Sequence, residues 1–504
     1  MKMLDPDWLL DADPRPVQIE ALRRSYGGFA AHDEHGAPVV PWALEGLSFP
    51  ARGWGHFLEM RLGKTPTLLN EYCLLRRDHG VNVAVVISPD SYKEAWAREA
   101  HKFGVPVPFM AMASKDQKDA EKFIADNPEG FGLVINYESA RVKKMVEFLT
   151  TVLQLGKSLM AVDESIKIKN HESMQTKKIM QLGKEADYTR ALSGRPSSQG
   201  PHDYYPQLRF CKALEGKNFY AFRNRYCDMG GFKNKAVKGT KNEVELKRII
   251  DRHAFVAKRR DWTRVVEPDF SVDDITMTER QQELYTSMDK DFLVELLDSE
   301  VVTVDQVVTK LNKLQQISSG FIYDEQKRAH WLLPRAEDIP KVARVLEILE
   351  QTNSKAVVFC HFKPSFELLR KTLEPFGLSV MGSRALMNEL GLDLEKEKEA
   401  FNNDPFKRVA LASAEVVKYG HDLSGVAGDR CELKVFYENS YNLDTRMQAE
   451  MRNTANNQDW ANLCIDLACS KIEKDTIRAL IRKESLVEAV LGSYGIDRGK
   501  VTIV

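Results

Sequence analysis

The sequence has little of what marks secreted, membrane-spanning or disulfide-bonded proteins. Its first residues, Met1 to Trp8, carry acids and a proline where a secretory signal needs a basic start and an apolar run. The longest apolar runs, such as Val83 to Ile87, are far shorter than the roughly 20 residues that span a bilayer. The seven cysteines form no CxxC pair, which argues against a zinc module and favours a reducing compartment. We therefore expect no membrane anchor and a cytoplasmic location.

A net charge of either sign is also missing, because 72 Lys and Arg residues face 73 Asp and Glu residues. Any polyanionic partner must therefore be held by a local basic surface. One candidate is residues 217–260, with 13 basic against 4 acidic residues and several interleaved aromatics. By itself this segment could equally be a solvated face.

Short apolar runs alternate along the chain with longer amphipathic stretches. Val83 to Ser88, Gly132 to Ile135 and Leu159 to Val162 are each followed by a helical pattern, and a second series begins at Ala356 to Phe359. This rhythm is typical of β-α units that build a mostly parallel sheet. The sequence therefore predicts an α/β fold with two such domains. Residues 278–318, between the two series, have the pattern of a long amphipathic helix.

The strongest local signal is the Gly63-Lys64-Thr65 triplet ahead of a helical run. A helix that opens in this way points backbone amides at phosphates, with the lysine on the β and γ oxygens and the threonine hydroxyl on magnesium. The alternative is a chance triplet at a surface turn.

A second signal lies about a hundred residues further on, where the apolar run Leu159 to Val162 ends in Asp163 and Glu164. In an ATP site Asp163 would hold magnesium and Glu164 would polarise the attacking water. An acidic pair at a strand end is usually only a solvated turn, but its place downstream of the phosphate loop favours the ATP site.

The segment from Asp163 to Asn170 resembles the DEAH box of Swi/Snf-type ATPases of helicase superfamily 2, and further landmarks follow in that family's order. They are Arg15-Pro16-Val17-Gln18, Ile87-Ser88-Pro89 with Trp96, Asn136-Tyr137-Glu138, Leu192 to Pro196, Val358 to Phe362, Ser413 with Gly420 and Leu423, and Gln448 to Arg452. The resemblance implies two RecA-like parallel-sheet lobes with a helical, basic insertion between them. The implied segments are an ATP-binding lobe at 1–212, a basic helical protrusion at 213–270, a helical lead-in at 271–333 and a second lobe at 334–504.

The resemblance also implies roles for individual residues. Lys64, Asp163, Glu164 and Arg452 would be catalytic, and Thr65 and Asp163 would hold Mg²⁺. Arg15, Gln18, Gly63, Lys64, Thr65 and Gln448 would bind ATP. Nucleic acid would be contacted by Ser88, Asn136, Tyr137, His361 and Ser413, and by Lys233, Lys235, Lys238 and Lys241 of the basic protrusion.

The sequence departs from the family pattern at sensitive positions. Arg61 replaces a glycine of the phosphate loop, Ser165 and Ile166 replace Ala-His, and Arg195 replaces the Thr of the Leu-Thr-Gly-Thr-Pro motif. Val417, Lys418 and Asp422 alter the motif that contains Ser413, and Ala455 and Asn457 replace an Arg and a Gly after Arg452. ATP and magnesium binding are expected, whereas fast hydrolysis is in question.

These patterns predict a DNA-dependent ATPase that translocates on or remodels double-stranded DNA. The alternatives are a nucleotide-gated DNA-binding protein with weak catalysis and a strand-separating or RNA-directed helicase. A form this compact suits a bacterium or its virus, and hence a bacterial cytoplasm or that of an infected host.

Overall fold

The computed structural model describes most of the chain. The described residues are 7–26, 49–198, 200–214, 216–230, 236–264, 266, 268–298, 301–302, 304–417, 423–426, 429–450, 461–482, 489–490, 493–494 and 502–503.

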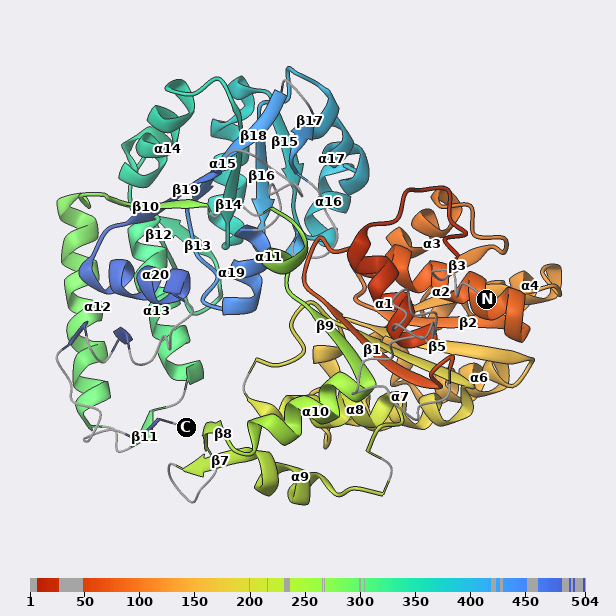
Figure 1. The fold of residues 1–504 in the computed structure, drawn as a ribbon. Coiled ribbons are helices and arrows are strands. Elements are labelled where there is room, and N and C mark those ends of the chain that lie inside the picture. The colour runs from red at the N-terminus through yellow and green to blue at the C-terminus, as the bar shows by residue number, and fades with distance from the viewer. Residues whose placement is uncertain are drawn as a thin grey trace. The chain divides into compact units, whose positions relative to one another are not determined.

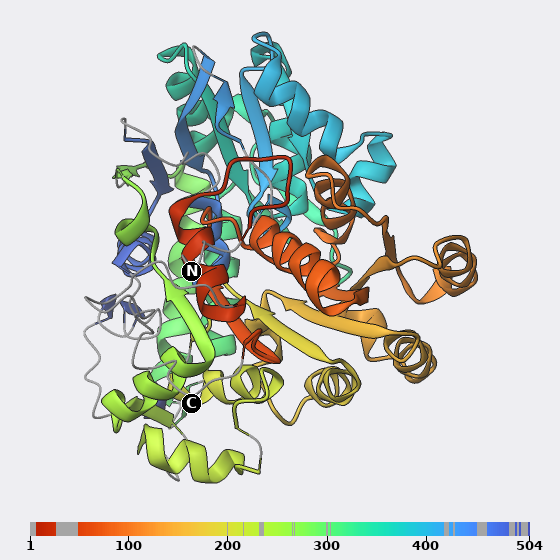
Figure 2. The same ribbon diagram turned by 45° about the vertical axis from the view of Figure 1, so that its right-hand side comes forward.

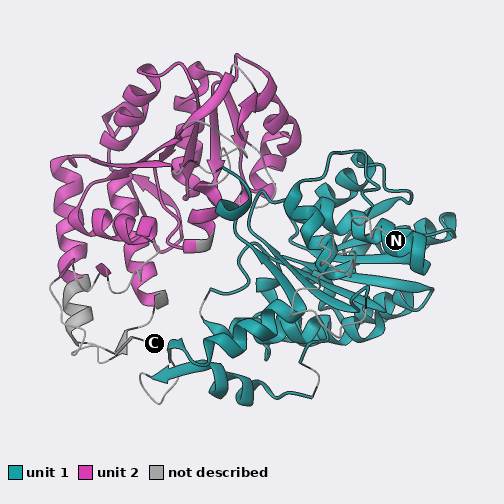
Figure 3. Ribbon diagram, viewed as in Figure 1, with its two compact units in different colours: residues 1–264 teal, residues 265–504 magenta. Residues whose placement is uncertain are grey.

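The chain divides into two compact units, residues 1–264 and 265–504 (Figure 3). Each unit is built around its own mainly parallel sheet, which confirms the predicted α/β fold with two RecA-like lobes. The boundary lies inside the predicted protrusion at 213–270, most of which belongs to the first unit. The predicted lead-in at 271–333 belongs to the second unit.

The first sheet has the strand order β3-β4-β2-β5-β6-β1-β9, and all neighbouring strands are parallel. Its strands are mostly buried along their length, as expected for a parallel sheet covered on both faces. The strands are β1 (Gly53–Leu58), β2 (Val81–Ser88), β3 (Phe109–Met112), β4 (Phe131–Asn136), β5 (Lys157–Asp163), β6 (Tyr188–Leu192) and β9 (Ala254–Ala257).

Alternate residues of these strands belong to separate cores on the two faces of the sheet. Val85 packs in one core with Leu149 of α6, and Val86 packs in another with Leu68 of α2. Figure 2 shows helices on both sides of this sheet. Outside the basic protrusion, the described helices of this unit are α1 (Pro16–Tyr26), α2 (Lys64–His79), α3 (Lys93–Lys102), α4 (Gln117–Asp126), α5 (Tyr137–Ala140), α6 (Lys143–Leu153), α7 (Met174–Glu185), α8 (Tyr204–Phe210) and α11 (Arg259–Trp262), with short 3-10 turns η2 (Ser114–Asp116), η3 (Ser165–Ile168) and η4 (Pro201–Asp203).

The basic protrusion is not purely helical. Helices α9 (Phe219–Tyr226) and α10 (Glu243–His253) flank an antiparallel pair of strands, β7 (Cys227–Gly230) and β8 (Ala236–Thr240). The chain then returns to the first sheet, where β9 pairs in parallel with β1 (Figure 1). The prediction of a helical insertion therefore missed both the hairpin and the returning strand.

The second sheet has the order β10-β19-β18-β14-β16-β15, with β17 paired to β18. Its edge strand β10 begins at the end of the predicted protrusion and runs into the segment predicted to be a helical lead-in, and it pairs in parallel with β19. The strands are β10 (Asp269–Asp274), β14 (Lys355–Cys360), β15 (Leu378–Met381), β16 (Val409–Ser413), β17 (Gly425–Val426), β18 (Asp429–Phe436) and β19 (Leu463–Ala468).

The predicted long helix at 278–318 is two helices, α12 (Glu279–Asp298) and α13 (Val304–Ser318). They share an apolar core with α20 (Lys471–Arg482) through residues such as Tyr285, Leu311 and Ile472. The other helices are α14 (Pro340–Glu350), α15 (Lys363–Thr372), α16 (Arg384–Leu390), α17 (Leu394–Asn403), α18 (Ala414–Val417) and α19 (Leu443–Glu450), with turns η6 (Ala336–Asp338) and η7 (Glu374–Phe376). Short strands β11 (Val301–Val302) and β20 (Thr502–Ile503) pair, as do β12 (Phe321–Tyr323) and β13 (Ala329–Trp331). Within the described residues, no helix combines the length and the apolar character needed to cross a bilayer.

Candidate active site

The predicted phosphate loop connects the end of β1 at Leu58 to the start of α2 at Lys64. Two of its residues adopt the left-handed backbone conformation that favours glycine, Arg61 at φ 70° and Gly63 at φ 83°. At Gly63 a side chain would also collide with Gln18, whose Nε2 would lie 2.3 Å from the added Cβ. Gly63 is therefore required by the turn, whereas Arg61 occupies a strained conformation at the position of a family glycine.

Helix α1 brings the predicted nucleotide-binding residues Arg15 and Gln18 onto this loop. The Gln18 side-chain amide donates to the Gly63 backbone carbonyl at 3.2 Å, and its Oε1 accepts from the Arg15 backbone N–H at 2.7 Å. The Arg15 guanidinium donates to the Arg61 carbonyl. Burial, together with the positive charge of Arg61, lowers the pKa of Arg15. The two guanidinium groups therefore add positive charge beside the loop.

The acidic pair lies at the end of β5, next to the phosphate loop. Lys64 Nζ is 3.9 Å from Glu164 Oε1, and Glu164 adopts a left-handed conformation with φ 51°. Asp163 is buried, and burial together with the neighbouring Glu164 raises its pKa to about 6. Burial makes the ionised form of this carboxylate unfavourable, and a bound cation would stabilise it.

Helix α3 contributes two contacts to this site that the sequence did not predict. The buried Trp96 indole donates to Asp163 Oδ2 at 3.0 Å. Tyr92, just before the helix, donates to Glu99 at 2.7 Å and lies close to Thr65. Asp163 is thus held from α3, and Thr65 is approached by the residue that precedes it. In the sequence, the residue that could have indicated the contact with Asp163 was Trp96 itself, because a buried indole N–H needs a hydrogen-bond acceptor.

A buried ion pair fixes α2 under the loop. Glu71 of α2 accepts two hydrogen bonds from Arg190 of β6, at 2.8 and 2.9 Å, and contacts His56 of β1 at 2.9 Å. Arg190 and His56 hold the pKa of Glu71 well below its usual value, against the opposing effect of burial. The helix that presents Lys64 is therefore locked to two strands of the sheet.

Two residues predicted to contact nucleic acid are instead buried against the acidic pair. Ser88 Oγ lies 3.4 Å from Asp163 Oδ2, and the Tyr137 hydroxyl donates to the backbone carbonyls of Asp163 and Glu164. Both side chains are fully buried, so they do not present a surface to nucleic acid here. Tyr137 braces the strained turn at Glu164. Asn136 is bound to Asp90 at 2.7 Å and caps α5.

The remaining predicted nucleic-acid contacts lie elsewhere on the two units. His361 directly follows β14, and Ser413 is the last residue of the neighbouring strand β16. Because Cys360 pairs with Ser413, both residues lie where these strands end, on the same side of the second sheet. Lys238 lies on β8, and Lys241 forms an exposed ion pair with Asp228 at 3.5 Å. Lys233 and Lys235 lie outside the described residues. Their contacts with nucleic acid stay predictions.

Several family departures can be located. Ser165, in place of the family alanine, is buried and donates to Gln207 at 2.6 Å, and the Arg195 backbone N–H donates to Ser193 Oγ at 3.2 Å. A side chain at Gly194 would approach Lys64 Nζ to 3.3 Å, so this turn lies beside the phosphate loop. Gln448 lies on α19 of the second unit. Lys418, Asp422, Arg452, Ala455 and Asn457 are outside the described residues.

The first unit therefore fits ATP and Mg²⁺. The loop amides and Lys64 suit phosphates, and Thr65 with Asp163 offers two oxygen ligands of the kind that Mg²⁺ prefers. Together with the two parallel sheets, this site defines a RecA-like nucleotide-binding fold. A family model described as the SNF2-related domain matches residues 56–320, just over half of the chain, and the chain belongs to this family.

Curated relatives of this chain include animal proteins named as SWI/SNF-related matrix-associated actin-dependent regulators of chromatin, subfamily A-like protein 1. The Caenorhabditis elegans homolog is 25% identical over 50% of this chain and 38% of its own length. The Xenopus laevis protein is 23% identical over 82% of this chain and 40% of its own length. The Drosophila melanogaster protein is 22% identical over 92% of this chain and 57% of its own length. The chain thus spans about half or less of these relatives, and they give no support to the expected bacterial or viral source.

A solved structure, the Sulfolobus solfataricus SWI2/SNF2 ATPase core in complex with dsDNA, is 18% identical to this chain. The match covers 98% of this chain and 96% of that one, with a TM-score of 0.42. A second structure, the Sulfolobus solfataricus SWI2/SNF2 ATPase core domain, is 16% identical, with coverages of 97% and 92% and a TM-score of 0.41.

Proposed function

We propose that this protein is a DNA-dependent ATPase that couples hydrolysis to translocation on, or remodelling of, double-stranded DNA. The observation that carries the proposal is the convergence of Lys64, Thr65, Asp163 and Glu164 at one end of the first sheet. Membership of the SNF2-related family supports the ATPase activity, and the relatives named as regulators of chromatin support DNA as the partner.

Each residue of the site has a distinct role in the proposed reaction. Lys64 neutralises charge on the transferred phosphate, and Glu164 orients the attacking water and accepts its proton. Thr65 and Asp163 would hold Mg²⁺, which would supply positive charge to offset that of the phosphates. The left-handed turn at Glu164, braced by Tyr137, directs its carboxylate toward Lys64.

A weakly catalytic, nucleotide-gated DNA-binding protein is the second candidate. Ser165, buried against Gln207, occupies the segment where the family has Ala-His, and Arg61 is strained in the phosphate loop. Both residues lie in segments that would bind ATP or respond to it, so both departures bear on the rate of hydrolysis. A cytoplasmic location and contacts of the basic protrusion with duplex phosphates are further parts of the proposal.

The discriminating measurement is steady-state ATP hydrolysis without nucleic acid, with single strands and with duplex. We expect strong stimulation by duplex, weaker nucleotide binding in Lys64→Ala, and trapped ATP with little turnover in Glu164→Gln. No turnover under any condition, with ATP still bound, would favour the second candidate. Equal ATP affinity of the wild type and Lys64→Ala would remove the phosphate-loop assignment.

A further inference from the structure

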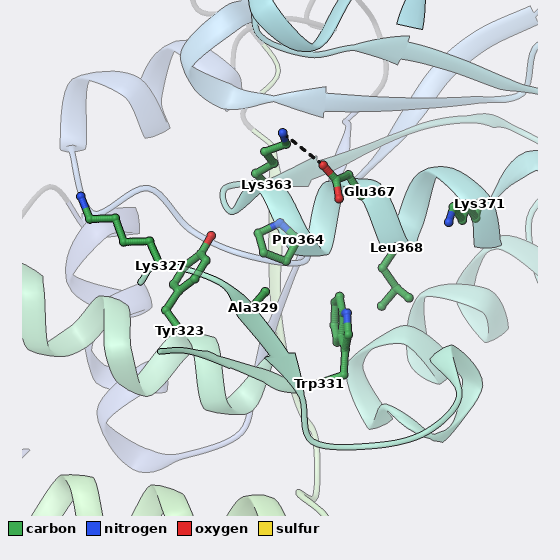
Figure 4. Close-up of a pocket in the computed structure, with 9 residues that line it drawn as sticks. All are labelled: Tyr323, Lys327, Ala329, Trp331, Lys363, Pro364, Glu367, Leu368 and Lys371. Atoms are coloured by element: carbon green, nitrogen blue, oxygen red, sulfur yellow. Dashed lines mark ion pairs between the residues drawn. The ribbon is translucent and has the colours of Figure 1, made fainter. Parts of the chain in front are cut away.

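A groove of about 440 Å³ lies in the second unit, between the β12–β13 hairpin and α15 (Figure 4). We call it the hairpin groove. Its lining includes none of the residues assigned to the ATP site. The hairpin groove is lined by Tyr323, Lys327, Ala329, Trp331, Lys363, Pro364, Glu367, Leu368 and Lys371.

Two aromatic rings of the groove pack against a buried phenylalanine and are partly exposed to solvent. Tyr323 and Trp331 are 37% and 39% exposed. Their ring centroids lie 5.4 and 5.6 Å from that of the buried Phe321, with which they share one face of the hairpin. Core packing thus holds both rings in place while part of each faces solvent. Large apolar surface held open in this way is typical of a binding site.

The groove also carries an excess of positive charge, with three lysines and one carboxylate in its lining. Lys363 is partly neutralised by Glu367 at 3.4 Å and Glu389 at 3.6 Å. Among the described residues, no carboxylate lies within ion-pair distance of Lys327 or Lys371, which are both exposed. These two ammonium groups are available to an anionic ligand.

The hairpin turn that carries Lys327 is held rigidly. The Asp324 carboxylate accepts from the Arg328 backbone at 2.8 Å, from its guanidinium at 2.9 Å, and contacts His330 at 2.9 Å. The Lys327 backbone N–H donates to the Asp324 carbonyl at 3.0 Å. A preformed turn loses little conformational entropy when a ligand binds.

We propose that the hairpin groove binds unpaired nucleotides of single-stranded nucleic acid. Bases would stack on the exposed faces of Tyr323 and Trp331, and the flanking phosphates would meet Lys327 and Lys371. Stacking platforms beside a basic track are how proteins hold single strands, because every base has a π-face. Bases inside a duplex stack on each other and leave no face for these rings. An acidic peptide would suit the lysines but would make no use of the open aromatic faces.

The test measures binding of a fluorescent oligo-dT of about 10 nucleotides, within the range of single-strand site sizes, and of a blunt duplex, both without ATP. Stacking is worth about 1–3 kcal/mol per base, so Trp331→Ala should weaken oligo-dT binding roughly five- to hundredfold. Duplex affinity should stay unchanged. The Lys327→Ala/Lys371→Ala pair, which removes only exposed side chains, should weaken oligo-dT binding and flatten its salt dependence.

Phe406→Ala is the matched control, because Phe406 is 83% exposed in the same unit but outside the groove. Trp331→Phe keeps a ring and should retain most of the affinity, which separates stacking from misfolding. Wild-type affinity in both the Trp331→Ala and the lysine variants would overturn the proposal, as would an equal loss on duplex. So would displacement of oligo-dT by poly-glutamate as effectively as by unlabelled oligo-dT. Because no ATP is present, these outcomes are independent of whether duplex stimulates hydrolysis.

Discussion

At the scale of single residues, the phosphate loop combines a required glycine with a strained arginine. The sequence predicted Gly63, Lys64 and Thr65 correctly as a loop followed by a helix, because the triplet and the helical pattern are local. It also identified Arg61 as a departure, but the left-handed φ of 70° became visible only in the structure. A side chain in this conformation costs about 1–2 kcal/mol.

Arg61→Gly should therefore stabilise the first unit relative to Arg61→Ala. Both substitutions remove the guanidinium, and only glycine relieves the strained backbone; glycine's greater freedom in the unfolded chain offsets part of the gain. We expect a difference of about 1 kcal/mol in the free energy of unfolding, measured by denaturant titration. Equal stabilities of the two variants would mean that the loop relaxes without strain.

At the scale of elements, helix α3 links a predicted DNA-contacting strand end to the ATP site. Trp96 donates to Asp163, and Tyr92, the residue before the helix, lies close to Thr65. Ser88, at the end of β2 just before this helix, also contacts Asp163. A movement of the end of β2 and of α3 would therefore displace both predicted Mg²⁺ ligands.

Trp96→Phe should weaken Mg²⁺-dependent ATP binding by roughly tenfold, since a hydrogen bond to a charged group is worth about 1.5–3 kcal/mol. The indole N–H stabilises the ionised carboxylate, so without it the pKa of Asp163 rises further above its usual value and less of the group is charged near neutral pH. ATP affinity measured in EDTA should not change. Trp262→Phe, on the short helix α11 of the same unit, is the control. A comparable loss in EDTA would assign Trp96 a purely structural role.

At the scale of the whole molecule, the proposed reaction calls for an arginine that contacts the transferred phosphate, and the candidates are Arg195 in the first unit and Arg452 in the second. Arg452 follows α19 of the second unit in sequence, and Ala455 stands where the family has its second arginine. An arginine that contacts the transferred phosphate is worth about three to five powers of ten in rate.

If Arg452 supplies this charge, Arg452→Ala should lower turnover by orders of magnitude and leave ATP binding nearly intact. Arg195, in the turn beside the phosphate loop, is the other candidate, and Arg195→Thr should then matter little. Ala455→Arg should then accelerate hydrolysis if the chain is a naturally slowed enzyme. Steady-state ATPase rates alongside equilibrium nucleotide binding separate these effects. Unchanged turnover in both Arg452→Ala and Arg195→Thr would exclude both arginines.

The sequence by itself determined the α/β class, the two lobes, and the positions of the phosphate loop and acidic pair, because each depends on local periodicity or a short motif. Only the tertiary structure assigned β9 to the first sheet and β10 to the second. Each is a short strand whose pairing partner lies about two hundred residues away, so no local pattern marks it. Tertiary packing likewise decided that Ser88, Tyr137 and Trp96 are buried around Asp163, since burial depends on which distant strands and helices meet.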